Sequence, residues 1–107
     1  MKLPDKMVVV FRSRLRADAD LQALEAAGAR MYELASAMPG FISYKDFTAA
    51  DGESVSIVEF RDAASLLAWR NHPEHVLMQQ RAREEFMADY HIQVCRPERD
   101  YSFHRDG

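Results

Sequence analysis

The sequence predicts an α+β domain in which a four-stranded antiparallel sheet carries two helical regions. Four short segments of the 107 residues are rich in apolar and β-branched side chains, as strands are. Two longer segments repeat their apolar residues every three or four positions, as amphipathic helices do. The resulting order of strand, helix, strand, strand, helix, strand is that of the ferredoxin-like, split βαβ fold.

The first half of the chain supplies the first strand and the first helix. Residues 7–16, MVVVFRSRLR, begin with apolar side chains at both parities, as a strand covered on both faces would. Residues 17–38 have helical spacing, and Asp18 and Asp20 are the two candidates for the N-cap. The pair 39–40, Pro-Gly, ends this helix because proline cannot continue the hydrogen-bond ladder.

Two strands and a turn follow. Residues 41–50 and 54–61 alternate as strands do, and Asp51 and Gly52 between them suit the positive φ angles of a tight turn. These two strands should form an antiparallel hairpin.

The second helical region is interrupted by a proline. Asp62 can cap the helix that carries Trp69, and Pro73 then stops that helix and starts a second one, which we expect to continue to about Tyr90. His72, directly before the proline, is expected to be exposed or to cap the new helix. Residues 91–96 close the domain as the fourth strand, in which Cys95 is expected to be a packed thiol.

Composition and charge exclude several classes of function. Fourteen basic and seventeen acidic residues give a net charge of −3 with no basic cluster, which argues against a nucleic-acid partner. The N-terminal apolar run is too short for a signal peptide or a membrane span, so we expect a cytoplasmic protein. The chain has no glycine-rich phosphate loop and no nucleophile elbow, and His72 and His75 lack a third ligand for a metal site held by protein alone.

Both faces of the predicted sheet are apolar, which bears on assembly. Two helices can cover only one face, and a large apolar face left in water is unusual for a monomer. We therefore expect a homodimer that closes the sheets face to face around a two-fold axis. The opposed sets are Val8 and Val10 against Met7, Val9 and Phe11; Phe41 and Phe47 against Ile42 and Tyr44; and Val55 and Ile57 against Val58 and Phe60.

One polar stripe lies along the core-facing side of the last predicted helix. His75, Gln79 and Arg83 follow at i, i+4 and i+8 on the side that also carries Phe86. An unpaired buried polar group costs about 1–3 kcal/mol, so these side chains should line a polar network or a wet pocket. A satisfied core or interface histidine and a purely structural Trp69 are the plainer alternatives.

Five segments together resemble the antibiotic biosynthesis monooxygenase domain, over almost the whole chain. They are MPGF at 38–41, EFRD at 59–62, AWRNHPEH at 68–75, the H-x-x-x-Q-x-x-x-R stripe at 75–83, and RDYSF at 99–103. The resemblance implies a dimeric α+β barrel built from one domain over 1–107, with a core of about 6–97 and a C-terminal extension of 98–107.

The resemblance also implies a cofactor-independent monooxygenase that acts on a quinol or a polycyclic phenol, in an apolar pocket between the sheet and the second helical region. His75 would be the general base, and Arg83 or Gln79 would stabilise the developing oxyanion. Three aromatic side chains are expected to contact the substrate: Trp69, Phe11 and Phe86. Ser65 and His75 take the places of an asparagine and a tyrosine in the phenol-oxidising relatives.

Two alternatives stay open at this point. The first is a haem-binding or haem-degrading monooxygenase, in which Trp69 would distort the macrocycle and His75 would ligate iron. In those relatives the ligand lies ten residues after the tryptophan, where this chain has Gln79, and the first strand offers Phe11 and Ser13 in place of an asparagine. The second is a non-catalytic dimer that binds a small hydrophobic ligand.

Overall fold

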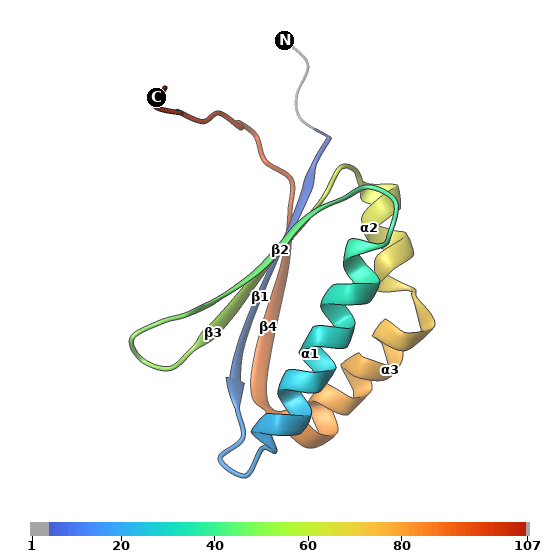
Figure 1. Cartoon of the computed structure of the whole chain (residues 1–107), viewed down its shortest axis with the longest axis vertical. Coiled ribbons are helices and arrows are strands. Elements are labelled where there is room, and N and C mark those ends of the chain that lie inside the picture. The colour runs from blue at the N-terminus through green and yellow to red at the C-terminus, as the bar shows by residue number, and fades with distance from the viewer. Residues whose placement is uncertain (1–4, 107) are drawn as a thin grey trace.

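A computed structural model describes residues 5–106, so residues 1–4 and 107 of the predicted single domain lie outside the described part. A four-stranded antiparallel sheet carries all helices on one face (Figure 1). The strands lie in the order β2-β3-β1-β4, which confirms the predicted ferredoxin-like fold class. The elements are β1 (Met7–Leu15), α1 (Leu21–Ser36), β2 (Phe41–Thr48), β3 (Ser54–Phe60), α2 (Ala63–Arg70), α3 (Pro73–Arg81), the π-helical turn η1 (Ala82–Phe86) and β4 (Met87–Cys95).

The helices begin at the aspartates that the sequence singles out. The Asp20 carboxylate accepts a hydrogen bond from the backbone N–H of Ala23 at 3.0 Å and caps α1. Asp18, the other candidate, instead pairs with Arg16 at 2.9 Å. Asp62 caps α2 by accepting from the N–H of Ser65 at 2.8 Å. Each cap satisfies a backbone donor that the first helical turn leaves unpaired.

The core lies between the middle of the sheet and the first two helices. Its buried members are Met31 and Ala35 from α1, Val58 and Phe60 from β3, and Trp69 from α2. These elements are distant in sequence, so the core fixes the position of the α2–α3 region over the sheet.

A bulge in β2 changes which of its side chains reach this core. The pairing of β2 with β3 shifts register between Phe41 and Ser43. As a result Phe41 and Tyr44 both pack against the core, while Phe47 is exposed on the opposite face. The prediction that Phe41 and Phe47 share a face opposite Tyr44 was wrong, because one extra residue reverses the alternation.

The face of the sheet away from the helices, here the open face, carries five apolar side chains: Val8, Val10, Phe47, Val55 and Ile57. The predicted parity of β1 and β3 is therefore confirmed. Cys95 pairs with Val8 in register, lies on the same face and is exposed, so the expectation of a packed thiol was wrong for the single chain.

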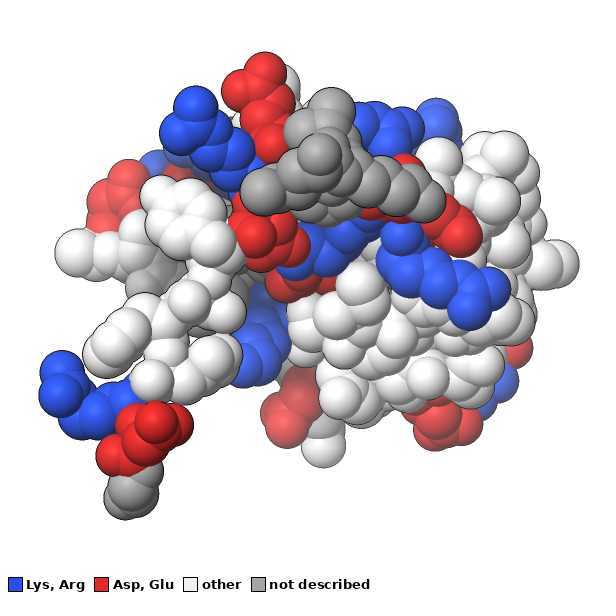
Figure 2. All heavy atoms as spheres, turned by 90° about the horizontal axis from the view of Figure 1, so that it is seen from above, with Lys and Arg blue, Asp and Glu red and all other residues white. Residues whose placement is uncertain are grey.

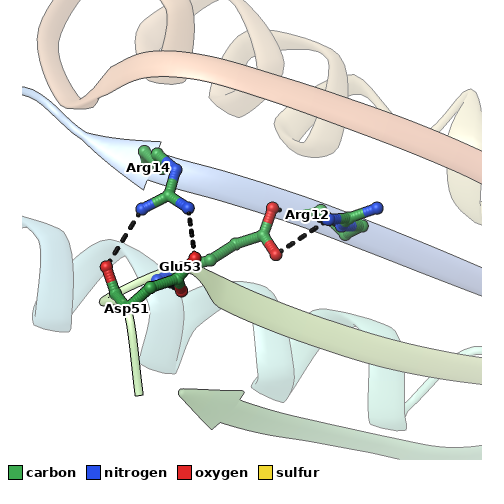
Figure 3. A network of polar contacts seen from close by, with 4 residues as sticks. All are labelled: Arg12, Arg14, Asp51 and Glu53. Carbon is green, nitrogen blue, oxygen red and sulfur yellow. Dashed lines mark hydrogen bonds and ion pairs between the residues drawn. The ribbon is translucent and has the colours of Figure 1, made fainter. Parts of the chain in front are cut away.

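Ion pairs hold the β2–β3 turn against β1 on the open face (Figure 3). The Arg12 guanidinium donates to both carboxylate oxygens of Glu53, at 3.1 and 3.0 Å. Arg14 donates to the Asp51 carboxylate at 2.7 Å. Gly52, at the predicted turn, has a φ of +90°. Exposed ion pairs of this kind add about 0–1 kcal/mol of stability each.

The second helical region ends earlier than the sequence pattern predicts. After Arg81 the chain makes the π-helical turn η1 and becomes extended at Met87, so the helix does not continue to Tyr90. Tyr90 instead pairs with Ser13 in the sheet. The backbone N–H of Arg16 donates to the Phe86 carbonyl at 2.9 Å, which helps to fix this reversal. Pairing with β1 therefore outweighs the helical propensity of this segment.

Candidate functional site

The break between α2 and α3 brings His75 onto Trp69. His72 accepts a hydrogen bond from the Glu74 N–H at its Nδ1, at 3.1 Å, and is the N-cap of α3, which confirms the predicted capping role. One turn later the His75 ring stacks on the Trp69 ring, with centroids 4.1 Å apart and planes 10° apart. The His75 Nδ1 lies 3.1 Å from the Trp69 carbonyl oxygen.

This contact determines which nitrogen of neutral His75 is basic. A carbonyl oxygen can only accept a hydrogen bond, so Nδ1 must carry the proton and Nε2 keeps its lone pair. Burial lowers the pKa of His75, and His72 adds to this, while the hydrogen bond to the Trp69 carbonyl opposes it. At neutral pH the imidazole is therefore uncharged and able to accept a proton at Nε2.

Trp69 supports His75 and the core together. Its side chain is 4% exposed and packs with Met31, Ala35, Val58 and Phe60. Because His75 covers one face of the indole, Trp69 does not offer an open stacking surface in this chain. Its role as a substrate contact stays a prediction.

The other two residues of the predicted stripe, Gln79 and Arg83, lie in different surroundings. Gln79 lies one turn after His75, is half-buried, and forms no side-chain hydrogen bond within residues 5–106. Arg83 is exposed in η1 and donates to the Tyr90 hydroxyl at 3.2 Å, and the Tyr90 ring lies 5.5 Å from that of Phe11. At about 1.5 Å per residue, the end of α3 at Arg81 lies about 9 Å beyond His75 along the helix axis, and Arg83 follows two residues later in η1, so it lies roughly 12 Å from His75.

The sheet side of this region is apolar and only partly covered. Tyr90, Ile92 and Val94 alternate on the face that the helices occupy, since they pair with Ser13, Phe11 and Val9 of β1. Ile92 is 46% and Val94 is 54% exposed, so the helices leave the β4 side of this face accessible.

Phe86, by contrast, is only 1% exposed, and its ring lies 5.0 Å from the Arg81 guanidinium. It belongs to the packed interior, and its role as a substrate contact also stays a prediction.

Other parts of the described surface are hollowed too. A groove of about 340 Å³ runs between α1 and α3, with Met31 and Met78 at the core side and the Arg30–Glu74 ion pair across it. At 100° per residue its α3 side chains form a different stripe from His75 and Gln79. A smaller hollow of about 140 Å³ lies on the open face, among Ser43, Lys45, Phe47, Ile57 and Glu59.

The described residues do not form a metal-binding cluster or a membrane-spanning helix. Among residues 5–106, no three His, Cys, Asp or Glu side chains are grouped so that they could hold a metal ion. No described helix has the length and apolar character needed to cross a membrane.

Tyr90 is the residue of this region that sequence reasoning placed on the wrong element. Its signal is the period of two in Tyr90, Ile92 and Val94, which alternate with polar residues as a half-buried strand does. The helical pattern before Tyr90 continues without a glycine or proline, so no residue marks the point where the helical period of 3.6 changes to the strand period of two.

Comparison with known proteins decides the family. The family model described as antibiotic biosynthesis monooxygenase matches residues 6–81, well over half of the chain. The chain belongs to this family. The match ends at the last residue of α3, so η1, β4 and the C-terminal segment lie beyond it. Monooxygenase-like function is thus supported at the level of the family, in agreement with the resemblance found in the sequence.

The chain is also similar to individual proteins along most of its length. The protein YqjZ of Bacillus subtilis (strain 168) is 27% identical over 100 residues, covering 94% of this chain and 86% of its own. The structure of Rv0793 from Mycobacterium tuberculosis aligns with a TM-score of 0.79 and 26% identity, over 91% of this chain and 99% of that one. SnoaB, a cofactor-independent oxygenase from Streptomyces nogalater, aligns with a TM-score of 0.74 and 15% identity, over 90% and 96%, which shows the shared fold.

Proposed function

We propose that this member of the antibiotic biosynthesis monooxygenase family oxidises a quinol or polycyclic phenol with dioxygen and without a cofactor. The observation that carries the proposal is the state of His75. Its Nδ1–H is held by the Trp69 carbonyl, its ring is stacked on Trp69, and burial lowers its pKa. A neutral imidazole with a free Nε2 is the form that a general base needs.

The chemistry requires only a base, a dry contact surface and the substrate's own electrons. His75 Nε2 takes a proton from the substrate, and the resulting anion donates electrons to dioxygen. The keto form of a polycyclic phenol, such as anthrone, has a ring CH₂ group that can be converted to a carbonyl. In that conversion four electrons leave the substrate; one oxygen atom of dioxygen joins the ring carbon and the other leaves as water. Because dioxygen accepts all four electrons, no external reductant is needed.

The polar groups along α3 and η1 suit an elongated ligand. Gln79 is free to donate a hydrogen bond to an oxyanion near His75, and Arg83 with Tyr90 lies about 12 Å further along the axis. The apolar side chains of β1 and β4 between them, Phe11 and Ile92, would contact the rings. The description of the structural relative SnoaB as a cofactor-independent oxygenase is consistent with this chemistry.

The residues around Trp69 fit haem binding less well than they fit the cofactor-independent reaction. The indole face that would lie against a macrocycle is covered by the His75 ring at 4.1 Å. Trp69 is also a buried member of the core, so freeing its face would disturb that packing. A titration with haemin should therefore show no saturation at one haem per chain.

We also propose that the working form is a homodimer paired through the open face. No described helix lies over that face (Figure 1), and a second copy would remove the exposed Phe47 and the four partly buried side chains, Val8, Val10, Val55 and Ile57, from water. Two sheets packed in this way would form the predicted α+β barrel.

Oxygen uptake tests the proposed reaction. Wild-type protein, His75→Ala and His72→Asn would be assayed with anthrone and with substituted quinols in the presence of a metal chelator. We expect His75→Ala to lose about 10²–10⁴-fold in rate, as the loss of a general base does. His72→Asn should retain activity, because asparagine also caps helices.

Uptake by wild type that persists in His75→Ala would refute the assigned base. If wild type oxidises none of these compounds, a non-catalytic ligand-binding dimer replaces the enzyme.

A further inference from the structure

The last described segment, residues 97–106, leaves the domain as an arm with two exposed aromatic side chains. It forms no helix or strand, and Tyr101 and Phe103 are 87% and 77% exposed. The radius of gyration is 15.2 Å, whereas a compact chain of this length has about 13 Å. Figures 1 and 2 both show this arm standing away from the body of the domain.

Ion pairs at the base of the arm determine the side on which it leaves. Lys6 binds Asp100 of the arm at 2.7 Å and Glu59 of β3 at 2.8 Å. Glu59 lies on the open face, since its neighbours Val58 and Phe60 are buried on the helix side. The arm therefore starts from the open-face side, away from the helices, where the partner in the proposed dimer would lie (Figure 1).

The arm concentrates apolar surface in one place. In an extended chain, residues two apart point to the same side, about 7 Å from each other, so Tyr101 and Phe103 can contact one surface together. Aromatic side chains with a polar tip are favoured at interfaces because they bury much area and still pair their hydroxyl group. Charged residues of both signs flank them, and Figure 2 likewise shows acidic and basic side chains interspersed on this end of the molecule.

The open face has a hollow whose size suits one aromatic ring. Its hollow of about 140 Å³ has Phe47 and Ile57 as apolar walls and Ser43, Lys45 and Glu59 as polar ones. An apolar cavity of about 150 Å³ is large enough to bind benzene, so one aromatic ring fits this volume. The Lys45 side chain forms no hydrogen bond or ion pair within residues 5–106, which leaves its ammonium group free to contact an aromatic face or a phenol oxygen.

We propose that the arm of one copy docks on the open face of a second copy, with the Tyr101 ring in the hollow beside Lys45. Two-fold symmetry makes the exchange reciprocal, so each copy gives one arm and receives one. The five residues 97–101 reach at most about 17–18 Å, and the Lys6–Asp100 pair fixes Asp100 next to Tyr101, so Tyr101 can contact only the part of the partner that lies beside this end of the sheet. The inference rests on the proposed pairing of open faces and not on the proposed chemistry.

Sedimentation over a range of protein concentrations measures the effect on the dimer. We expect Tyr101→Ala and Ser43→Trp, which fills the hollow, each to raise the dimer dissociation constant at least tenfold. Leu77→Ala is the matched control, because Leu77 is an exposed apolar side chain on the helix side, at 65% exposure. It should leave dissociation unchanged.

Cross-linking identifies which copy receives the arm. Full-length Tyr101→Cys and Ser43→Cys chains, both in a Cys95→Ser background, are mixed and treated with a short bismaleimide. A linked pair that contains one chain of each kind supports the proposal.

Three results overturn it: a monomer at all concentrations, a Tyr101→Ala dimer as tight as the control, or no linkage between the Tyr101→Cys and Ser43→Cys chains. Oxygen uptake is measured separately, so failure of the proposed reaction would not be mistaken for failure of the arm.

Discussion

Removing the His75 side chain should destabilise the fold by an amount that the Trp69 contact sets. In His75→Ala the ring stacked at 4.1 Å and the hydrogen bond to the Trp69 carbonyl at 3.1 Å are both lost. The carbonyl itself stays paired, because the backbone N–H of His72 donates to it at 3.1 Å. No unsatisfied buried acceptor is therefore created.

The magnitude follows from these two contacts. An aromatic pair contributes about 0.5–1.5 kcal/mol beyond its buried area. A net intramolecular hydrogen bond contributes about 0.5–1.5 kcal/mol. Their sum is roughly 2 kcal/mol, which lowers the midpoint of thermal unfolding by roughly 8–16 °C for a domain of this size.

Thermal and urea unfolding at one fixed protein concentration measure this loss, since a dimer's midpoint depends on concentration. His72→Asn serves as the control and should change the midpoint little. A loss below about 0.5 kcal/mol in His75→Ala would refute the reasoning, because it would mean that the stacked geometry contributes nothing to the native state.

Three further predictions concern pH and local backbone structure. Because the folded pKa of His75 lies below its unfolded value of about 6.5, wild type should lose unfolding free energy relative to His75→Ala as pH falls below 6.5; urea midpoints at pH 5 and 7.5 that shift equally in both would contradict this. Gly40→Ala should cost more than Gly52→Ala in urea unfolding, since both have positive φ but only at Gly40 would the new Cβ meet the Ser65 side chain; equal losses would exclude that contact. Asp62→Ala should cost about 1 kcal/mol through the lost cap of α2, and Asp62→Asn far less; similar losses by denaturant titration would show that the cap is not the cause.

Local signals in the sequence predict most of the fold. The aspartate caps, the Pro-Gly stop and the Asp51–Gly52 turn each depend on a few neighbouring residues, and the structure contains all of them. The bulge at the start of β2 could not be predicted in this way. The bulge depends on tertiary packing, because it lets Phe41 and Tyr44 both fit a core made by α1, α2 and β3.

The candidate site was predicted less completely for a related reason. The stripe of His75, Gln79 and Arg83 assumes one unbroken helix, but η1 begins before Arg83 and directs it to Tyr90 on β4. No glycine or proline marks the end of α3, so sequence alone gives no boundary there. The stacking of His75 on Trp69 likewise requires the angle between α2 and α3, which only the folded chain supplies.

The central claim, that His75 takes a proton from a bound phenol, is tested most directly without oxygen. A phenol whose absorbance changes on ionisation would be mixed anaerobically with the protein, one pH unit below the phenol's own pKa. We predict that a larger fraction of the phenol is ionised when it is bound to wild type than when it is bound to His75→Ala, because only wild type offers Nε2 as an acceptor for the proton. An ionised fraction in wild type no larger than that in His75→Ala would contradict the assignment of His75 as the base.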